Sequence, residues 1–168
     1  MLPGQLSREL FMIRHLAFAA ALLCSTGAYA ASAEHFLSDA IKGDNSESRL
    51  GQLIASRGHS EAVRRYGHTL HADHSKARVQ ASKVARQMGV PVPSAMMPEA
   101  RAELSKLQRL HGKAFDREVR RYMIDDHRKD IAEFRDQARH GDRRTAALAS
   151  QQLPTLRKHL RMAESLPG

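Results

Sequence analysis

The sequence predicts an all-α protein, a ferritin-like four-helix bundle of two helical hairpins with a short crossover helix. Three observations predict it: long segments carry apolar residues at helical spacing, no segment alternates with the period of a strand, and glycine or proline breaks separate the segments. Four long segments, with a short one between the second and third, give two hairpins joined by a long connection.

The expected helices follow from these breaks. The first ends before Gly58, Ser60 caps the second, and Pro98 opens the short third. Gly141-Asp142 forms a turn and cap before the last helix, which Pro154 should kink or split. The expected spans are residues 33–56, 61–88, 98–110, 114–140 and 143–166. None is apolar all round, so no membrane span is expected in this part of the chain.

Residues 1–30 have the pattern of a cleaved secretory signal peptide. Met12-Ile13-Arg14-His15 is a basic start, residues 16–24 are an apolar run, and Ala28-Tyr29-Ala30 has the small-x-small form of a cleavage site. The run is shorter than the roughly 20 residues that span a bilayer. We therefore expect a mature domain of residues 31–168 in the periplasm or outer envelope, with translation starting at either Met1 or Met12.

Composition narrows the function classes. The one cysteine, Cys24, lies in the predicted leader, so the mature domain has no disulfide and no thiolate metal site. The net charge of +9 falls to +8 without Arg8, Glu9 and Arg14, and could attract an anionic envelope surface. Basic residues spread over every helix without interleaved aromatics, which argues against nucleic acid as a partner. Self-association is a further open possibility.

A loose repeat places two histidines on apolar seams. Residues 70–76 and 123–129 both read Leu/Met-x-x-Asp-His-x-Lys, with His74 and His127 at the matching positions. A titratable ring on a core-facing seam costs free energy unless it has a partner. The repeat therefore predicts a polar layer inside the bundle.

The layer could hold a metal ion. Glu47 lies on the first apolar stripe and His159 flanks the last, so every long helix offers one polar residue near the core. Imidazole and carboxylate together suit zinc or copper, and Asp73 and Asp126 could orient imidazoles on neighbouring helices. The alternative is a structural layer in which the same residues only hydrogen-bond to one another.

Other constellations are weaker. His68, His71 and His74 could form a surface copper or zinc site, and Met96-Met97 suits gap-filling at the bundle end better than copper ligation. No Glu-x-x-His pair of a di-iron centre is present. Phosphate loops, nucleophile elbows and His-Glu-x-x-His are also absent, which favours a non-enzymatic role.

Several motifs together resemble one family. They are Phe36-Leu37-Ser38-Asp39-Ala40, Asp73-His74-Ser75-Lys76-Ala77, residues 112–117, residues 123–129 and Leu153-Pro154-Thr155-Leu156-Arg157-Lys158-His159-Leu160. The chain from about Glu34 to Ala163 thereby resembles the exported bacterial family called domain of unknown function 4142. The resemblance implies a ferritin-like bundle in the periplasm or outer envelope and supplies no activity. It also implies that the family's Glu and His positions correspond to Glu47, His74, His127 and His159.

Three function classes follow. The main interpretation is a non-enzymatic, envelope-associated helical bundle. The first alternative is a metal-binding or metal-buffering bundle that uses the inward Glu and His layer, with zinc or copper as its ion. The second alternative is an electrostatic binder of anionic envelope components.

Overall fold

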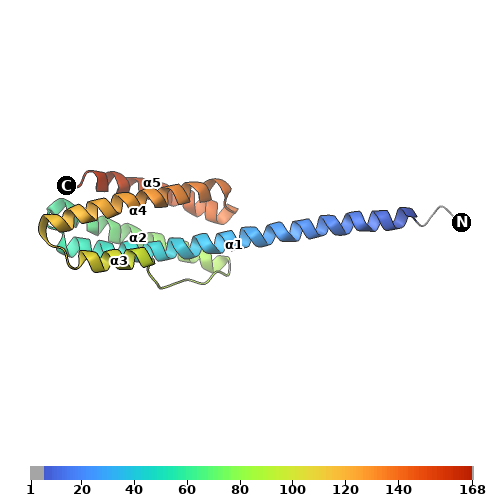
Figure 1. Ribbon diagram of the computed structural model, residues 1–168, viewed down its shortest axis with the longest axis horizontal. Coiled ribbons are helices and arrows are strands. Elements are labelled where there is room, and N and C mark those ends of the chain that lie inside the picture. The colour runs from blue at the N-terminus through green and yellow to red at the C-terminus, as the bar shows by residue number, and fades with distance from the viewer. Residues whose placement is uncertain (1–5, 168) are drawn as a thin grey trace.

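The computed structural model describes residues 6–167, with side chains from residue 32 onward. It has five helices and, within this range, no strand: α1 Leu6–Arg57, α2 Glu61–Gln87, α3 Pro98–Leu107, α4 Gly112–His140 and α5 Arg143–Glu164 (Figure 1). The predicted all-α class is confirmed, while the ferritin-like designation stays a prediction. The predicted cleavage after Ala30 lies outside the residues whose side chains are described.

The helix boundaries agree with the prediction except at a few ends. The first helix begins at Leu6 rather than near residue 33, because its Ala- and Leu-rich start has high helix propensity and no proline. The third helix ends at Leu107, three residues early, and the fourth begins at Gly112 itself. Of the two outcomes predicted for Pro154, a split of the last helix is wrong, since α5 continues through this residue.

Local chemistry explains where α2 and α5 begin and end. The Ser60 side chain accepts a hydrogen bond from the backbone nitrogen of Val63, and Asp142 caps α5 by accepting from the nitrogens of Arg144 and Thr145. After α2, Gly89 takes a positive φ of 71°, which an L side chain adopts only with strain. The predicted caps are therefore confirmed.

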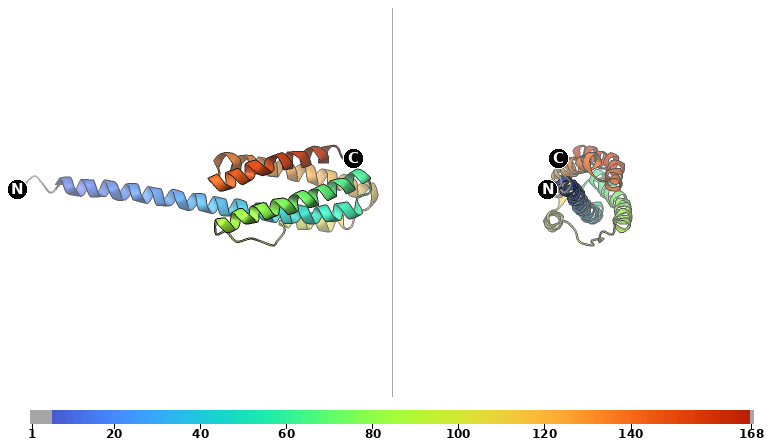
Figure 2. Two further views of the ribbon diagram at one scale, coloured as in Figure 1. Left: turned by 180° about the vertical axis from the view of Figure 1, so that it is seen from behind. Right: turned by 90° about the vertical axis from the view of Figure 1, so that its right-hand side faces the viewer.

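The helices pair as two hairpins. α1 packs most extensively against α2, and α4 against α5, while α2 and α5 hold the two hairpins together. The short α3 contacts both α1 and α4, and it lies on the outside of the bundle beside them (Figures 1 and 2). α1 and α4 themselves approach far less closely than the helices of either hairpin. This looser pair is where the cavity described below opens.

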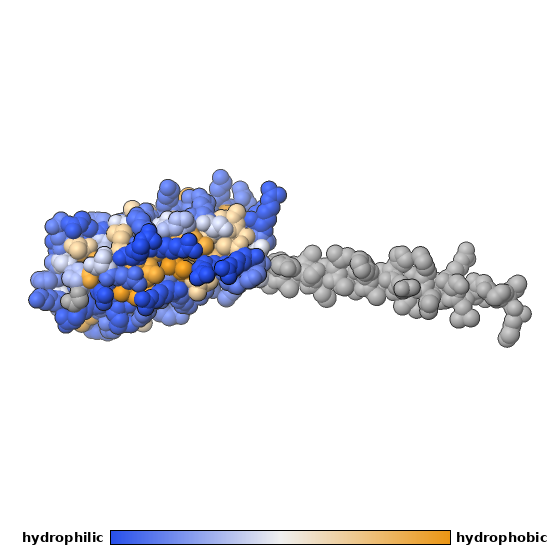
Figure 3. Space-filling view, turned by 90° about the horizontal axis from the view of Figure 1, so that it is seen from above, coloured by the Kyte–Doolittle hydropathy of each residue, from blue (hydrophilic) through white to orange (hydrophobic). Residues whose placement is uncertain are grey.

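Apolar side chains fill both ends of the bundle. The larger core cluster includes Leu50, Tyr66, Phe115 and Met123, all buried. Met96 and Met97 pack against it, so their predicted gap-filling role is confirmed. Outside, hydrophilic residues cover most of the face seen from above, around a short apolar strip (Figure 3). Within the described range, no helix combines the length and apolarity needed to cross a membrane.

A pair of glycines lets α1 and α2 approach closely. A β-carbon on Gly51 would lie 2.7 Å from the backbone nitrogen of His71, and one on Gly67 would lie 2.7 Å from the Gly51 carbonyl oxygen. Both neighbours are backbone atoms of the facing helix, so no flexible side chain can move aside. The close approach fixes the register of α1 against α2, and with it the position of Glu47 relative to His74.

Gly67→Ala should therefore destabilise the fold by about 2–3 kcal/mol, because the added methyl group must push two helix backbones apart. Gly43→Ala is the matched control, since its β-carbon would meet nothing within 4 Å. That change should stabilise the protein by about 0.5–1 kcal/mol, through lower entropy of the unfolded chain. Urea melts measure both, and equal effects would contradict the close approach.

Candidate metal centre

Three imidazoles from three helices meet in the middle of the bundle. They are His74 of α2, His127 of α4 and His159 of α5, which are 4%, 0% and 0% exposed. Their ring centroids lie 6.0 Å apart for His74 and His127, 5.1 Å for His74 and His159, and 5.4 Å for His127 and His159. One ring nitrogen from each lies within 4.8 Å of one from each of the others.

The hydrogen bonds of two rings fix their tautomers. The Nδ1 atom of His127 lies 3.0 Å from the Met123 carbonyl oxygen, which can only accept, so Nδ1 carries the proton. The Nε2 atom of His159 lies 2.9 Å from Asp73 Oδ2. Although partial burial raises it, the pKa of Asp73 is held below its usual value by hydrogen bonds from His159 and Lys158. Asp73 is therefore an ionised acceptor, and His159 carries its proton on Nε2.

The opposite nitrogens of these two rings are consequently bare lone pairs. His127 Nε2 and His159 Nδ1 are buried, and neither has a hydrogen-bond partner in the described part of the chain. Burial, followed by the nearby His74 and His159, lowers the pKa of His127 well below its usual value. Burial and then His74 lower the pKa of His159 to about 4. Both rings are thus neutral at neutral pH, the state that ligates metals.

The third ring is oriented by a carboxylate from α1. His74 Nδ1 lies 2.9 Å from Asp44 Oδ1, and both residues are buried. The proton between them can rest on either atom, and when Nδ1 carries it, Nε2 also presents a lone pair to the centre. Burial lowers the pKa of His74 to about 4, against the opposing effect of Asp126 and Asp73.

Glu47 of α1 lies beside the three imidazoles, so each of the four long helices contributes a residue to this region. Its Oε2 atom lies 4.0 Å from His74 Nε2, and neither carboxylate oxygen has a hydrogen-bond partner among residues 32–167. Glu47, Asp126 and His127 also bring ligand atoms within 4.8 Å of one another. Burial first, and then the charge of Asp126, raises the pKa of Glu47 well above its usual value. Ionising Glu47, a buried carboxyl group beside other acids, costs free energy unless a cation lies next to it.

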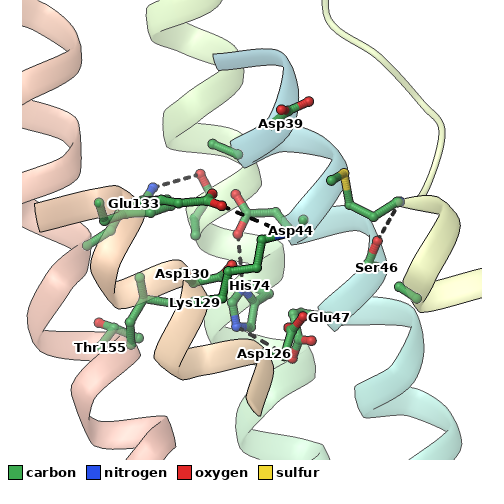
Figure 4. Close-up of a pocket in the computed structure, with 18 of the residues that line it drawn as sticks. Asp39, Asp44, Ser46, Glu47, His74, Asp126, Lys129, Asp130, Glu133 and Thr155 are labelled. Atoms are coloured by element: carbon green, nitrogen blue, oxygen red, sulfur yellow. Dashed lines mark hydrogen bonds and ion pairs between the residues drawn. The ribbon is translucent and has the colours of Figure 1, made fainter. Parts of the chain in front are cut away.

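Further carboxylates continue outward from Glu47. Burial raises the pKa of Asp44, of Asp126 and of Asp130, and the charge of Asp126 adds to the shift of Asp130. These groups line a cavity of about 1020 Å³ (Figure 4). His74 and Glu47 belong to the cavity wall, whereas His127 and His159 lie beyond it. The imidazole cluster therefore sits directly behind the inner wall of this cavity.

The arrangement can hold a divalent ion. Metal-bound histidines usually donate their second ring N–H to a carboxylate or backbone carbonyl, as His74, His127 and His159 are placed to do with Asp44, Met123 and Asp73. A zinc ion with bonds of 2.0–2.1 Å would hold tetrahedral ligand atoms roughly 3.3 Å apart. The ring nitrogens lie within 4.8 Å of one another, so a bound ion requires them to move closer together.

Of the four residues predicted from the sequence, the three histidines form one group, and Glu47 lies beside His74 and His127 in a second group with Asp126. The two predicted orienting carboxylates differ in their contacts: Asp73 binds His159, while Asp126 lies beside Glu47 and has no hydrogen bond to an imidazole among those the described residues form. Sequence reasoning missed Asp44, the partner of His74, and Asp130. Their spacing was a usable signal, because Asp44 precedes Glu47 by three residues and Asp130 follows Asp126 by four, so each pair shares a helix face.

The alternative site of His68, His71 and His74 together does not form. His74 is buried while His68 is exposed, so the two point away from a common ligand. The Nδ1 atom of His71 is already engaged by Ser48 Oγ at 2.9 Å. The three histidines therefore form no common site among the described residues, while a surface site of His68 and His71 alone stays a prediction.

The chain is similar to known proteins at two levels. It matches the family model described as domain of unknown function (DUF4142) over residues 19–166. No curated protein matches it in sequence. Among solved structures, it resembles the crystal structure of a DUF305 fragment from Deinococcus radiodurans, with a TM-score of 0.69 and 21% identity over 79% of this chain and 92% of that one. This likeness shows a shared helical fold. Because the family model spans most of the sequence, the chain belongs to the DUF4142 family.

Proposed function

We propose that this protein binds one divalent transition-metal ion, zinc or copper, in the core of its helical bundle. His74, His127 and His159 would be the nitrogen ligands and Glu47 the carboxylate ligand. The observation that carries the proposal is the pair of buried lone pairs on His127 Nε2 and His159 Nδ1, which have no hydrogen-bond donor among the described residues, in a cluster whose ring nitrogens lie within 4.8 Å of one another. A cation can accept both lone pairs at once.

A purely structural polar layer is less well supported. Buried polar groups in folded proteins are nearly all hydrogen-bonded, and a layer that served packing alone should satisfy its own members. Here a ring nitrogen of each histidine and both oxygens of Glu47 lack a partner within residues 32–167. A bound ion would satisfy them together and neutralise the carboxylate.

The proposed role is to bind or buffer the metal rather than to catalyse a reaction. Three imidazoles and a carboxylate can fill a four-coordinate site, and structural or storage sites are closed in this way. Asp73 and Asp44 hydrogen-bond to the imidazoles of His159 and His74. These bonds would raise the basicity of the two ligands and hold their rings in place.

Calorimetric titration of tag-free protein with zinc and with copper tests this role. We expect one ion per chain with a Kd below about 1 µM. We also expect binding to release protons, because burial and Asp126 raise the pKa of Glu47 and the metal binds the deprotonated carboxylate. Repeating the titration in buffers of different ionisation enthalpy measures this release. Absence of stoichiometric heat with both metals would favour the structural layer instead.

We further propose that the protein works in the periplasm or outer envelope. The basic start, the apolar run and Ala28-Tyr29-Ala30 support export, and an excess of Lys and Arg suits anionic envelope surfaces. Mass spectrometry of the envelope fraction should find a mature amino terminus at Ala31. An uncleaved chain, or one lipidated at Cys24, would contradict this part of the proposal.

A further inference from the structure

We propose that the cavity between α1 and α4 captures hydrated divalent cations and delivers them to the histidine centre. The inference rests on the proposed metal-binding function and adds to it the route by which the ion enters. It concerns the carboxylates outside the proposed ligand set: Asp130 and Glu133, which the proposed centre does not use, and Asp44, which also orients His74.

Charge is strongly segregated in this molecule. Of the chain's 18 Asp and Glu residues, eleven line the cavity, whereas only three of its 27 Lys and Arg residues do. The protein carries a net charge of +9, so the cavity wall is an acidic region within a basic protein. A cleft lined by one sign of charge, with low-dielectric walls, focuses the field and raises the local concentration of counter-ions.

The acids form two facing rows. α1 contributes Asp39 and Asp44, α4 contributes Asp130 and Glu133, and all four belong to the cavity wall (Figure 4). Ionised carboxylates on facing helices repel one another, and α1 and α4 approach far less closely than the helices of either hairpin. Retaining such a gap costs packing energy, which argues for a use.

The rows end at the centre with unpartnered oxygens. Asp44 is 5% exposed and Glu47 is 2% exposed, and both line the cavity. Asp44 Oδ2 and both oxygens of Glu47 have no hydrogen-bond partner in the described structure. Asp44 also binds His74 through Oδ1, so it connects the acidic rows directly to the first imidazole.

The cavity suits a transient, hydrated ion better than a second fixed site. Six waters around an ion occupy roughly 180 Å³, which fits easily within the cavity of about 1020 Å³. The outer carboxylates form no group with ligand atoms close enough to hold a bare ion; among the described residues, the two such groups both include His127. Oxygen ligands at the wall would hold the ion through its waters, and the imidazoles would then replace those waters.

Stopped-flow kinetics tests the route, with Cu²⁺ as the probe and quenching of tyrosine emission as the signal. The cavity variant is Asp130→Asn with Glu133→Gln, which removes two carboxyl groups from the cavity wall without removing a proposed ligand. The matched control is Glu61→Gln with Glu164→Gln, two carboxylates outside the cavity wall whose side chains are 73% and 43% exposed. If the cavity pair fails to fold, Asp39→Asn with Asp136→Asn at the mouth replaces it.

We expect the cavity variant to bind Cu²⁺ about three- to tenfold more slowly than the unmodified protein at low ionic strength. Its dissociation rate and its stoichiometry of one ion should be unchanged, and the control should associate within about twofold of the unmodified rate. Added salt should slow the unmodified protein more than the cavity variant.

The two proposals fail differently. Equal association rates in all variants would overturn the entry route while leaving the metal centre intact. Faster dissociation with unchanged association would also overturn it, by making Asp130 and Glu133 ligands. No uptake of Cu²⁺ by the unmodified protein would remove the proposed function, and the entry route with it.

Discussion

The His127→Ala variant should lose at least about 100-fold in metal affinity. His127 belongs to both groups of potential ligands, and it is the one member of the three-imidazole group that α4 contributes. Loss of a direct ligand exceeds the 10- to 100-fold cost that is typical when only a residue behind a ligand is removed. Calorimetric titration of both proteins with zinc measures the change in affinity.

Stability separates the ligand role of His127 from its packing role. In metal-free protein, His127→Ala should cost about 1–3 kcal/mol, because a fully buried ring is replaced by a cavity. His127→Phe keeps much of the volume and should recover part of that loss without recovering metal affinity. His140→Ala is the control, since its side chain is 70% exposed, and should cost under about 0.5 kcal/mol. Equal losses for His127 and His140 would contradict the buried placement.

Glu47→Gln should have opposite effects on the two forms of the protein. Without metal, the variant should be more stable than the unmodified protein by about 1–3 kcal/mol at pH 8, because a buried acid is replaced by a neutral side chain of the same shape. With metal, it should bind about 10- to 100-fold more weakly, because the negatively charged ligand is lost.

The stability difference between Glu47→Gln and the unmodified protein should depend on pH. Burial and Asp126 raise the pKa of Glu47 above its unfolded value, so the folded protein binds this proton more tightly than the unfolded chain. That contribution to stability is present below the unfolded pKa and is lost as pH rises through the raised folded pKa. The advantage of Glu47→Gln should therefore grow from near zero at about pH 4 towards pH 8.

Denaturant melts of metal-free protein across this pH range measure the effect. Glu61→Gln is the control, because its side chain is 73% exposed, and it should show no such growth. If Glu47→Gln is destabilising at every pH, then Glu47 is a structural partner of Asp126 and not a ligand held ready for a cation. A residue that weakens the metal-free fold and strengthens the metal-bound one is typical of a functional site.

The imidazoles make the opposite contribution to acid stability. Burial lowers the pKa of His74 and His159 to about 4, below the usual 6.5 of the unfolded chain. Their contribution to stability is complete above pH 6.5 and falls as the pH drops from there towards 4, because the unfolded chain then binds more protons. Comparison of the Glu47 variant with the unmodified protein at each pH cancels this shared term.

Much of the fold and the four central residues could be predicted from the sequence. The helices are defined by local signals such as the Ser60 cap and the breaks at Gly58 and Gly89, and local signals can be seen along a single chain. His74 and His127 lie on apolar seams, and a seam residue of a bundle helix must face the core.

The remainder depends on how the helices sit against one another. Asp44 shares a helix face with Glu47, but its contact with His74 depends on how α1 packs against α2, and the Gly51 and Gly67 contact fixes that packing. Asp126 was expected to orient an imidazole, but the spacing of α1 and α4 places it beside Glu47. The acidic cavity is likewise a property of the gap between two helices and has no signature in either helix alone.

X-ray absorption spectroscopy of tag-free protein loaded with one equivalent of zinc tests the central claim most directly. The proposed centre predicts three imidazole nitrogens at about 2.0–2.1 Å with one oxygen ligand, and loss of one imidazole from that shell in His127→Phe. A zinc shell of oxygen ligands with at most one imidazole, unchanged by His127→Phe, would contradict it.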